Sequence, residues 1–212
     1  MTSPISPIKS RLRDAFGEAV KETYKVIGEP TALPDAEQLA KDDPYQFQWW
    51  ALGLVDARPH QQRKGSDQGI DGRLLFHDEG EGGATKQIIL SVKSGHVNVA
   101  HVRDLRGVIE REKAEIGVLL TLEDATKPMR TEAAAAGIYK SPWGKRDSEN
   151  LHYPRLQILT IAELLEGKGI DYPHMTNVTF KRAPRAEAPQ PEQLTLAPPT
   201  DSAKPRKPRK HS

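Results

Sequence analysis

The chain has 212 residues, carries a formal net charge of +2 and contains no cysteine. This length suits one domain of about 100 to 200 residues with appendages. The lack of cysteine excludes a disulfide scaffold, thiolate metal sites and a cysteine nucleophile. No apolar run approaches the roughly 20 residues that a membrane span needs, and the N-terminus lacks a signal-peptide core. We therefore expect a soluble, cytoplasmic protein with no membrane partner.

The N-terminal part of the chain is predicted to be helical. Residues 1–42 form a helical extension, and a domain of residues 43–182 follows. A helix over residues 43–57 begins with Asp43 as its N-cap and Pro44 in its first turn. Its apolar residues recur at helical spacing and are expected to face a sheet: Phe47, Trp50, Ala51, Leu54 and Val55.

Two antiparallel strands are predicted next. A turn-rich stretch at residues 65–72 leads into a strand at residues 73–77, and residues 79–83 are typical of a hairpin loop. The second strand covers residues 86–93. Side chains alternate along a strand, which places Ile88, Leu90 and Val92 on one face and Gln87, Ile89, Ser91 and Lys93 on the other. Ser91 and Lys93 therefore point the same way.

The remaining elements alternate between helix and strand. Helical spacing predicts a helix over about residues 99–113, and the continuous apolar strand at residues 116–121 should be buried on both faces. The later elements are a helix at 127–136, a strand at 156–159 and a helix at 161–166, which begins with a capping box of Thr160 and Glu163. This order predicts an α/β fold in which helices cover a mixed sheet.

The C-terminal segment, residues 183–212, differs from the rest in composition. It contains seven of the seventeen prolines and six Lys and Arg against three Asp and Glu. Its charge is thus +3, which leaves the body of the chain at −1. The segment has few large apolar residues, so we expect a disordered, basic tail. Lys204, Arg206 and Lys207 could contact phosphates there, or could simply be solvated.

Asp71 and Lys93 could together support phosphodiester chemistry. Hydrolysis of a phosphodiester by water needs a divalent cation held by oxygen ligands, and a positive charge that positions the water. Asp71 lies at the start of one strand and Lys93 at the end of its predicted partner. The sequence therefore predicts that these side chains converge at one edge of the sheet.

Four segments resemble Mrr-type restriction-endonuclease domains of the PD-(D/E)XK class. They are Gly-Ser-Asp-Gln-Gly-Ile-Asp-Gly at 65–72, Ser-Val-Lys at 91–93, Val-Arg-Asp-Leu-Arg-Gly-Val at 102–108 and Ile-Gly-Val-Leu-Leu-Thr at 116–121. The resemblance covers roughly residues 43–166 and implies a restriction-endonuclease-like fold. Residues 45–52, 72–78, 100–107 and 127–130 also resemble the C-terminal extension of some bacterial adenine or cytosine amino-methyltransferases.

The resemblance implies roles for individual residues. Asp71 would be a ligand of Mg²⁺ or Mn²⁺, the Val92 carbonyl would assist it, and Lys93 would be the catalytic lysine. Ser91 occupies the catalytic position where the family pattern has a carboxylate or an amide, so one metal ligand is missing. Asp67, or Gln46 or Gln48 from the preceding helix, could fill that coordination place.

Two functions follow as alternatives. The first is a Mg²⁺-dependent DNA endonuclease linked to restriction-modification. The second is a non-catalytic DNA-recognition module that accompanies a DNA methyltransferase, and Ser91 favours it. In both cases DNA is the expected partner, in the nucleoid, and Arg103 and Arg106 could contact its phosphates or be ordinary solvated helix residues. A methyltransferase subunit and a second copy of the chain are open as further partners.

Overall fold

A computed structural model provides the structure of the protein. It describes residues 5–17, 19–20, 23–24, 26, 28–60, 69–78, 83–142 and 152–173. Asp67, most of the expected hairpin loop and the predicted tail from Ala183 onward lie outside these residues. Within the described parts, no helix is long and apolar enough to cross a membrane.

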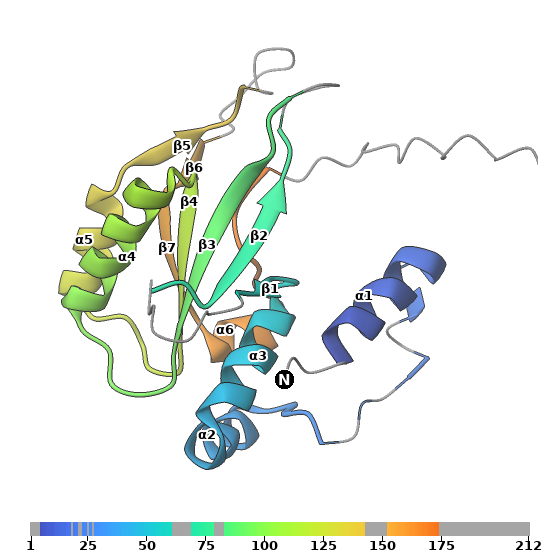
Figure 1. Ribbon diagram of the computed structural model, residues 1–212. Helices are drawn as coiled ribbons and strands as arrows, with labels where there is room; N and C mark the ends of the chain where they lie inside the picture. Colours follow the sequence, from blue (N-terminus) through green and yellow to red (C-terminus); the bar gives the residue numbers. More distant parts are fainter. Residues whose placement is uncertain are drawn as a thin grey trace, which may run out of the picture. The chain divides into compact units, whose positions relative to one another are not determined.

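The centre of the fold is a five-stranded mixed sheet (Figure 1). Its strands lie in the order β1, β2, β3, β4, β7. The first three pair antiparallel, whereas β3, β4 and β7 run parallel to one another. The bounds are Arg58–Pro59 for β1, Gly72–Phe76 for β2, Lys86–Lys93 for β3, Ile116–Thr121 for β4 and Leu156–Thr160 for β7.

Helices cover both faces of this sheet, which confirms the predicted α/β class. Figure 1 shows α4 (Val99–Glu112) and α5 (Lys127–Ala135) on one side and α3 (Pro44–Leu54) and α6 (Ile161–Leu165) on the other. α2 (Leu33–Asp42) packs beside α3. Two apolar clusters result, one beneath each helical layer.

The alternation predicted for β3 is confirmed. Ile88, Leu90 and Val92 belong to the cluster beneath α2, α3 and α6, whereas Ile89 belongs to the cluster beneath α4 and α5. The strand β4 is buried at all six positions, as its continuous apolar sequence predicts. Both central strands are therefore fixed in register by side chains on two faces.

The apolar stripe of α3 differs from the prediction at two residues. Leu54 is exposed and Leu52 is fully buried instead. Leu52 packs over Gly72 of β2, where a Cβ atom would lie only 2.5 Å from its Cδ2 atom. The helix thus buries a second side because a glycine lets it approach the sheet. The Asp43 cap is as predicted, with its carboxylate accepting from the N–H groups of Tyr45 and Gln46.

The N-terminal residues contain two helices. α1 (Ile5–Phe16) makes ion pairs through Lys9 with Glu29 and through Arg13 with Asp56. α2 buries two alanines in the same cluster as α3 and ends at Asp42, next to the cap of α3. The second helix of the predicted extension therefore contributes to the core.

Three short strands were not predicted: β1, and the two-stranded sheet of β5 (Ile138–Lys140) and β6 (His152–Pro154). The strand β7 leads away from this small sheet. Its buried residue Gln157 donates to the Pro154 and Asp171 carbonyls and accepts from the Asp171 N–H. The segment that follows α6 is thereby held against the sheet.

Candidate functional site

The backbone around Asp71 is fixed by the strands on either side. The Asp71 N–H donates to the Leu90 carbonyl at 2.9 Å, and the Asp71 carbonyl accepts from the His60 N–H at 2.9 Å. Asp71 directly precedes β2, opposite the end of β3. The local backbone therefore presents its side chain at the edge of the sheet where β3 ends.

Gln48, Ser91 and Val92 all donate to the Asp71 carboxylate. Gln48 Nε2 of α3 lies 3.0 Å from Oδ1. On Oδ2, the Val92 N–H donates at 2.7 Å and the Ser91 hydroxyl lies 3.2 Å away. The structure thus brings Asp71, Ser91 and one of the two candidate glutamines together. Gln46 is exposed, and no described contact joins it to this cluster.

Val92 and Lys93 are the last two residues of β3, at the same edge of the sheet as Asp71. A strand residue points its N–H and C=O to the same side, so the Val92 carbonyl faces the side on which Asp71 lies. Lys93 is half-buried, shares a strand face with Ser91, and lies about 6.6 Å further along at 3.3 Å per residue. Its ammonium makes no hydrogen bond or ion pair with another described residue. The convergence of the Asp71 and Lys93 side-chain ends stays a prediction.

The described residues do not fit the expected Mg²⁺ site. Mg²⁺ needs an octahedron of oxygen atoms and is usually held through one or two carboxylates. Among the described residues of this cluster, Asp71 is the single carboxylate, and Gln48 turns a donor toward it. Among the described residues, no group of three or more His, Asp or Glu could hold a metal. The magnesium prediction therefore rests on Asp67, which lies outside them.

The two arginines predicted to contact DNA are paired with acidic residues. Arg103 Nε lies 3.0 Å from Glu132 Oε2 of α5. Arg106 contacts the other oxygen of Glu132 at 3.7 Å and Glu110 at 3.5 Å. Their charge is thus compensated by helix α5 and by α4 itself. Lys204, Arg206 and Lys207 lie in the undescribed segment.

A buried polar cluster at the opposite end of β3 was missed. Asp78 is 0% exposed and accepts a hydrogen bond from the Tyr139 hydroxyl. Lys86 Nζ lies 2.8 Å from Asp78 Oδ1 and 2.9 Å from the Tyr139 hydroxyl. Lys86 and Lys93 are the first and last residues of β3, about 23 Å apart at 3.3 Å per residue. The cluster therefore lies apart from Asp71.

The ionisation of this buried cluster follows from its contacts. Burial alone would raise the pKa of Asp78, but contacts with Lys86, Tyr139 and Ser141 hold the pKa below its ordinary value. Burial raises the pKa of Tyr139 to about 12, and the Asp78 carboxylate adds to the shift. The sequence contained one sign of this buried cluster. Strand alternation places Lys86 on the same face of β3 as the apolar residues Ile88 and Leu90, which indicates a buried position for its side chain.

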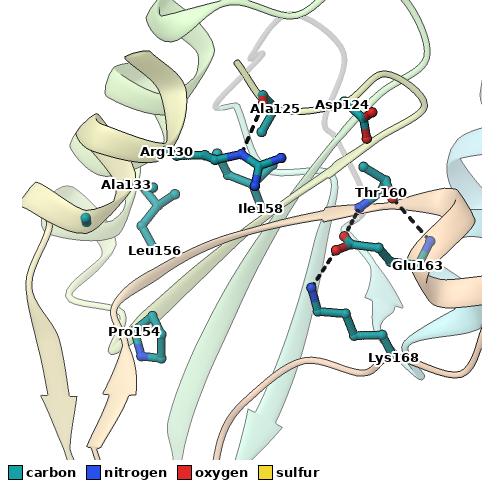
Figure 2. A pocket seen from close by; sticks show the side chains of 11 residues that line it. Asp124, Ala125, Arg130, Ala133, Pro154, Leu156, Ile158, Thr160, Glu163 and Lys168 are labelled. Atoms are coloured by element: carbon teal, nitrogen blue, oxygen red, sulfur yellow. Dashed lines mark hydrogen bonds and ion pairs between the residues drawn. The ribbon is translucent and has the colours of Figure 1, made fainter. Parts of the chain in front are cut away.

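A shallow pocket of about 290 Å³ lies beside β7 and α5 (Figure 2). Leu156 and Ile158 form part of its apolar lining. The Glu163 carboxylate accepts a hydrogen bond from the Thr160 N–H and pairs with Lys168 Nζ at 2.6 Å. Arg130 Nε donates to the Ala125 carbonyl. These polar groups hold neighbouring elements together. The pocket is therefore a junction between helices and β7, and its contacts indicate no particular ligand.

Comparison with known protein families matches residues 45–166, more than half of the chain, to the family described as NACHT-associated inactive Restriction Endonuclease 1. No curated protein and no solved structure matches the chain. The match agrees with the mixed sheet and its two helical layers, and it supports the predicted restriction-endonuclease-like fold. It gives no support to an Mrr-type assignment or to a link with methyltransferases. The chain belongs to the NACHT-associated inactive Restriction Endonuclease 1 family.

Proposed function

We propose that this chain is a non-catalytic, restriction-endonuclease-like domain that binds DNA at the edge of the sheet where β3 ends. The hydrogen bonds that Gln48, Ser91 and Val92 donate to the Asp71 carboxylate support the proposal most directly. Hydrogen bonds to an ionised group are charge-assisted, so these donors stabilise the carboxylate in the absence of a cation. The word "inactive" in the family name points the same way.

Lys93 supports the DNA part of the proposal. Its ammonium is a cation without a partner among the described residues, whereas Arg103 and Arg106 are compensated by acidic side chains. A lysine at the end of β3 offers one phosphate contact, which contributes affinity but no sequence specificity. Lys93 is therefore expected to contribute to binding without cleavage.

A second candidate is metal-dependent cleavage of DNA. It is supported by the order of Asp71, Val92 and Lys93 along the chain, which is the order that the resemblance implies for a carboxylate, a carbonyl and a lysine. Cleavage would require Asp67 or a similar residue to complete the metal ligands.

The family name also associates its members with NACHT, so we extend the proposal to a NACHT-containing partner for this chain. The methyltransferase partner and the homodimer stay predictions.

A binding assay on the full chain tests the proposal. Fluorescence anisotropy with a labelled 20-base-pair duplex would compare the wild type with Lys93→Ala across a salt series in EDTA. Loss of one phosphate contact should weaken binding about 3- to 10-fold and lower the salt slope by about one. Lys140→Ala is the matched control, because Lys140 is an exposed lysine of β5 that the proposal does not use.

The contrary outcomes are distinct. If Lys93→Ala binds DNA as the wild type does, or if EDTA abolishes binding, the proposed site is wrong. A plasmid-nicking assay with Mg²⁺ and Mn²⁺ separates the two candidates. Cleavage by the wild type that disappears in Asp71→Ala would establish the enzyme and reject the non-catalytic proposal.

A further inference from the structure

Helix α3 presents an exposed aromatic side chain beside the Asp71 cluster. Tyr45 lies three residues before Gln48, so the two side chains are neighbours on one face of the helix. Gln48 is fixed by its 3.0 Å contact with Asp71 Oδ1. The position of Tyr45 relative to the edge with Lys93 is therefore set by the same helix that binds the cluster.

The backbone of Tyr45 is fixed by hydrogen bonding, whereas its side chain is exposed. Its N–H donates to the Asp43 cap at 3.0 Å, and Pro44 precedes it in the first turn. The side chain is nevertheless 72% exposed, the highest value among the exposed large hydrophobic residues of the described parts. Among the described residues, its side chain has no hydrogen-bond partner and its ring has no aromatic neighbour. A rigid backbone with an open aromatic face is suited to stacking at low entropic cost.

We propose that this edge prefers unpaired DNA, with one base stacked on Tyr45 and a nearby phosphate at Lys93. The inference rests on the proposed function and adds the form of DNA that the site takes. In a duplex, each base is already stacked between its neighbours, so its face is closed to a side chain. An unpaired base exposes that face, and stacking on aromatic residues is the usual basis of sequence-tolerant single-strand binding.

The charge of the edge is consistent with such a ligand. The Asp71 carboxylate is screened by hydrogen-bond donors, so it repels an approaching phosphate less than an open carboxylate would. Lys93 then supplies a local positive charge on a body whose net charge is close to zero. Stacking is needed in addition, because a single lysine contact gives little affinity at physiological salt.

The test compares a labelled 20-nucleotide single strand with its own duplex on the full chain, by anisotropy in EDTA. The wild type should bind the single strand at least 5-fold more tightly. Tyr45→Ala should weaken single-strand binding about 5- to 100-fold, as expected for the loss of one stacked base, with little effect on the duplex. Tyr45→Phe should keep the preference, because the ring is retained.

Phe16→Ala is the matched control, since Phe16 is an aromatic residue on α1 with 70% exposure. It should behave as the wild type. If both DNA forms bind equally and both weaken in Lys93→Ala, the stacking inference fails and the proposed function stands. If Lys93→Ala binds both forms as the wild type does, the proposed function fails and the inference fails with it. Unchanged melting temperatures would show that each variant is folded.

Discussion

Ser91 determines, at the scale of single residues, what the edge of the sheet can hold. It is only 5% exposed, and its hydroxyl lies 3.2 Å from Asp71 Oδ2. A hydroxyl in this position adds a donor to the carboxylate, whereas a second carboxylate would add a ligand and a charge. The choice of serine therefore favours a hydrogen-bonded cluster over a metal site.

Ser91→Glu tests this interpretation directly. Without metal, the new carboxylate is buried beside Asp71, so the free energy of unfolding should fall by about 3 kcal/mol. With Mn²⁺ at 100 times its dissociation constant, about 2.7 kcal/mol should return, because the ion binds the folded state. Thermal unfolding with and without MnCl₂ measures both effects.

Ser91→Gln is the matched control, because it adds a similar volume without a charge. It should lose stability through crowding but should not respond to Mn²⁺. An equal Mn²⁺ response in both variants would contradict the idea that the serine is what keeps this cluster free of metal.

Sequence reasoning reached part of this site. The common direction of Ser91 and Lys93 follows from strand alternation, a local rule that the structure bears out in β3. The contact between Gln48 and Asp71 joins residues 23 positions apart and depends on how α3 lies on the sheet. The pairing of Arg103 with Glu132 likewise joins two different helices. Local patterns carry no information on such contacts.

At the scale of elements, long periodic segments were predictable and short ones were not. The strands β3 and β4 have the predicted ends, and the capping box of Thr160 and Glu163 begins α6 as expected. The strands β1, β5 and β6 have only two or three residues each. Two or three residues are too few to show the alternation of apolar and polar side chains that predicts a strand. These strands form because a partner strand pairs with them.

The packing of α4 on β4 leads to a prediction with a built-in control. A Cβ atom at Gly117 would lie 2.2 Å from Cδ1 and 2.7 Å from Cγ1 of Ile109. Because Ile109 is itself fully buried, Gly117→Ala should lower the free energy of unfolding by about 1–3 kcal/mol. Gly107 lies on the exposed side of α4 with nothing within 4 Å, so Gly107→Ala should raise stability by about 0.5–1 kcal/mol.

Urea unfolding of both variants measures these changes. A Gly117→Ala protein as stable as the wild type would mean that α4 does not approach β4 this closely. Loss of stability in Gly107→Ala would mean that the outer side of α4 is not free.

At the scale of the whole molecule, the Asp78 cluster joins two parts of the fold. It connects the hairpin of β2 and β3 with the small sheet of β5 and β6 through Lys86 and Tyr139. The arrangement of the main sheet was predictable from the order of its elements, because alternating helices and strands favour parallel pairing. The small sheet could not be predicted, since a buried network of distant residues holds it in place.

The Asp78 cluster predicts how stability depends on pH. The folded-state pKa of Asp78 is lower than its ordinary value of 3.8, so the unfolded chain takes up the proton first as pH falls. The stabilisation should be complete above about pH 5 and should be lost as pH drops through the folded pKa. At pH 7, the free energy of unfolding of Asp78→Asn should be about 3 kcal/mol lower than that of the wild type, because Lys86 loses its buried partner.

Urea unfolding at pH 7, 5, 4 and 3 tests this expectation. The difference between the wild type and Asp78→Asn should shrink toward pH 3. Asp104→Asn, which changes an exposed carboxyl of α4, is the control and should cost little stability at pH 7. A gap between the wild type and Asp78→Asn that stays constant with pH would reject the assigned role of this carboxylate.

Gln157 also sets the point at which the folded unit can be truncated. The family match ends at residue 166, but two of the backbone groups that bind the Gln157 amide, the carbonyl and the N–H of Asp171, lie beyond that limit. Tyr172, which packs its ring against Phe76, lies beyond that limit as well. A fragment cut at residue 166 would leave a buried amide without these partners, at a cost of about 1–3 kcal/mol, beside the edge strand β7. A fragment that ends at residue 166 should therefore unfold at a lower urea concentration than one that ends at Pro173, which keeps both contacts.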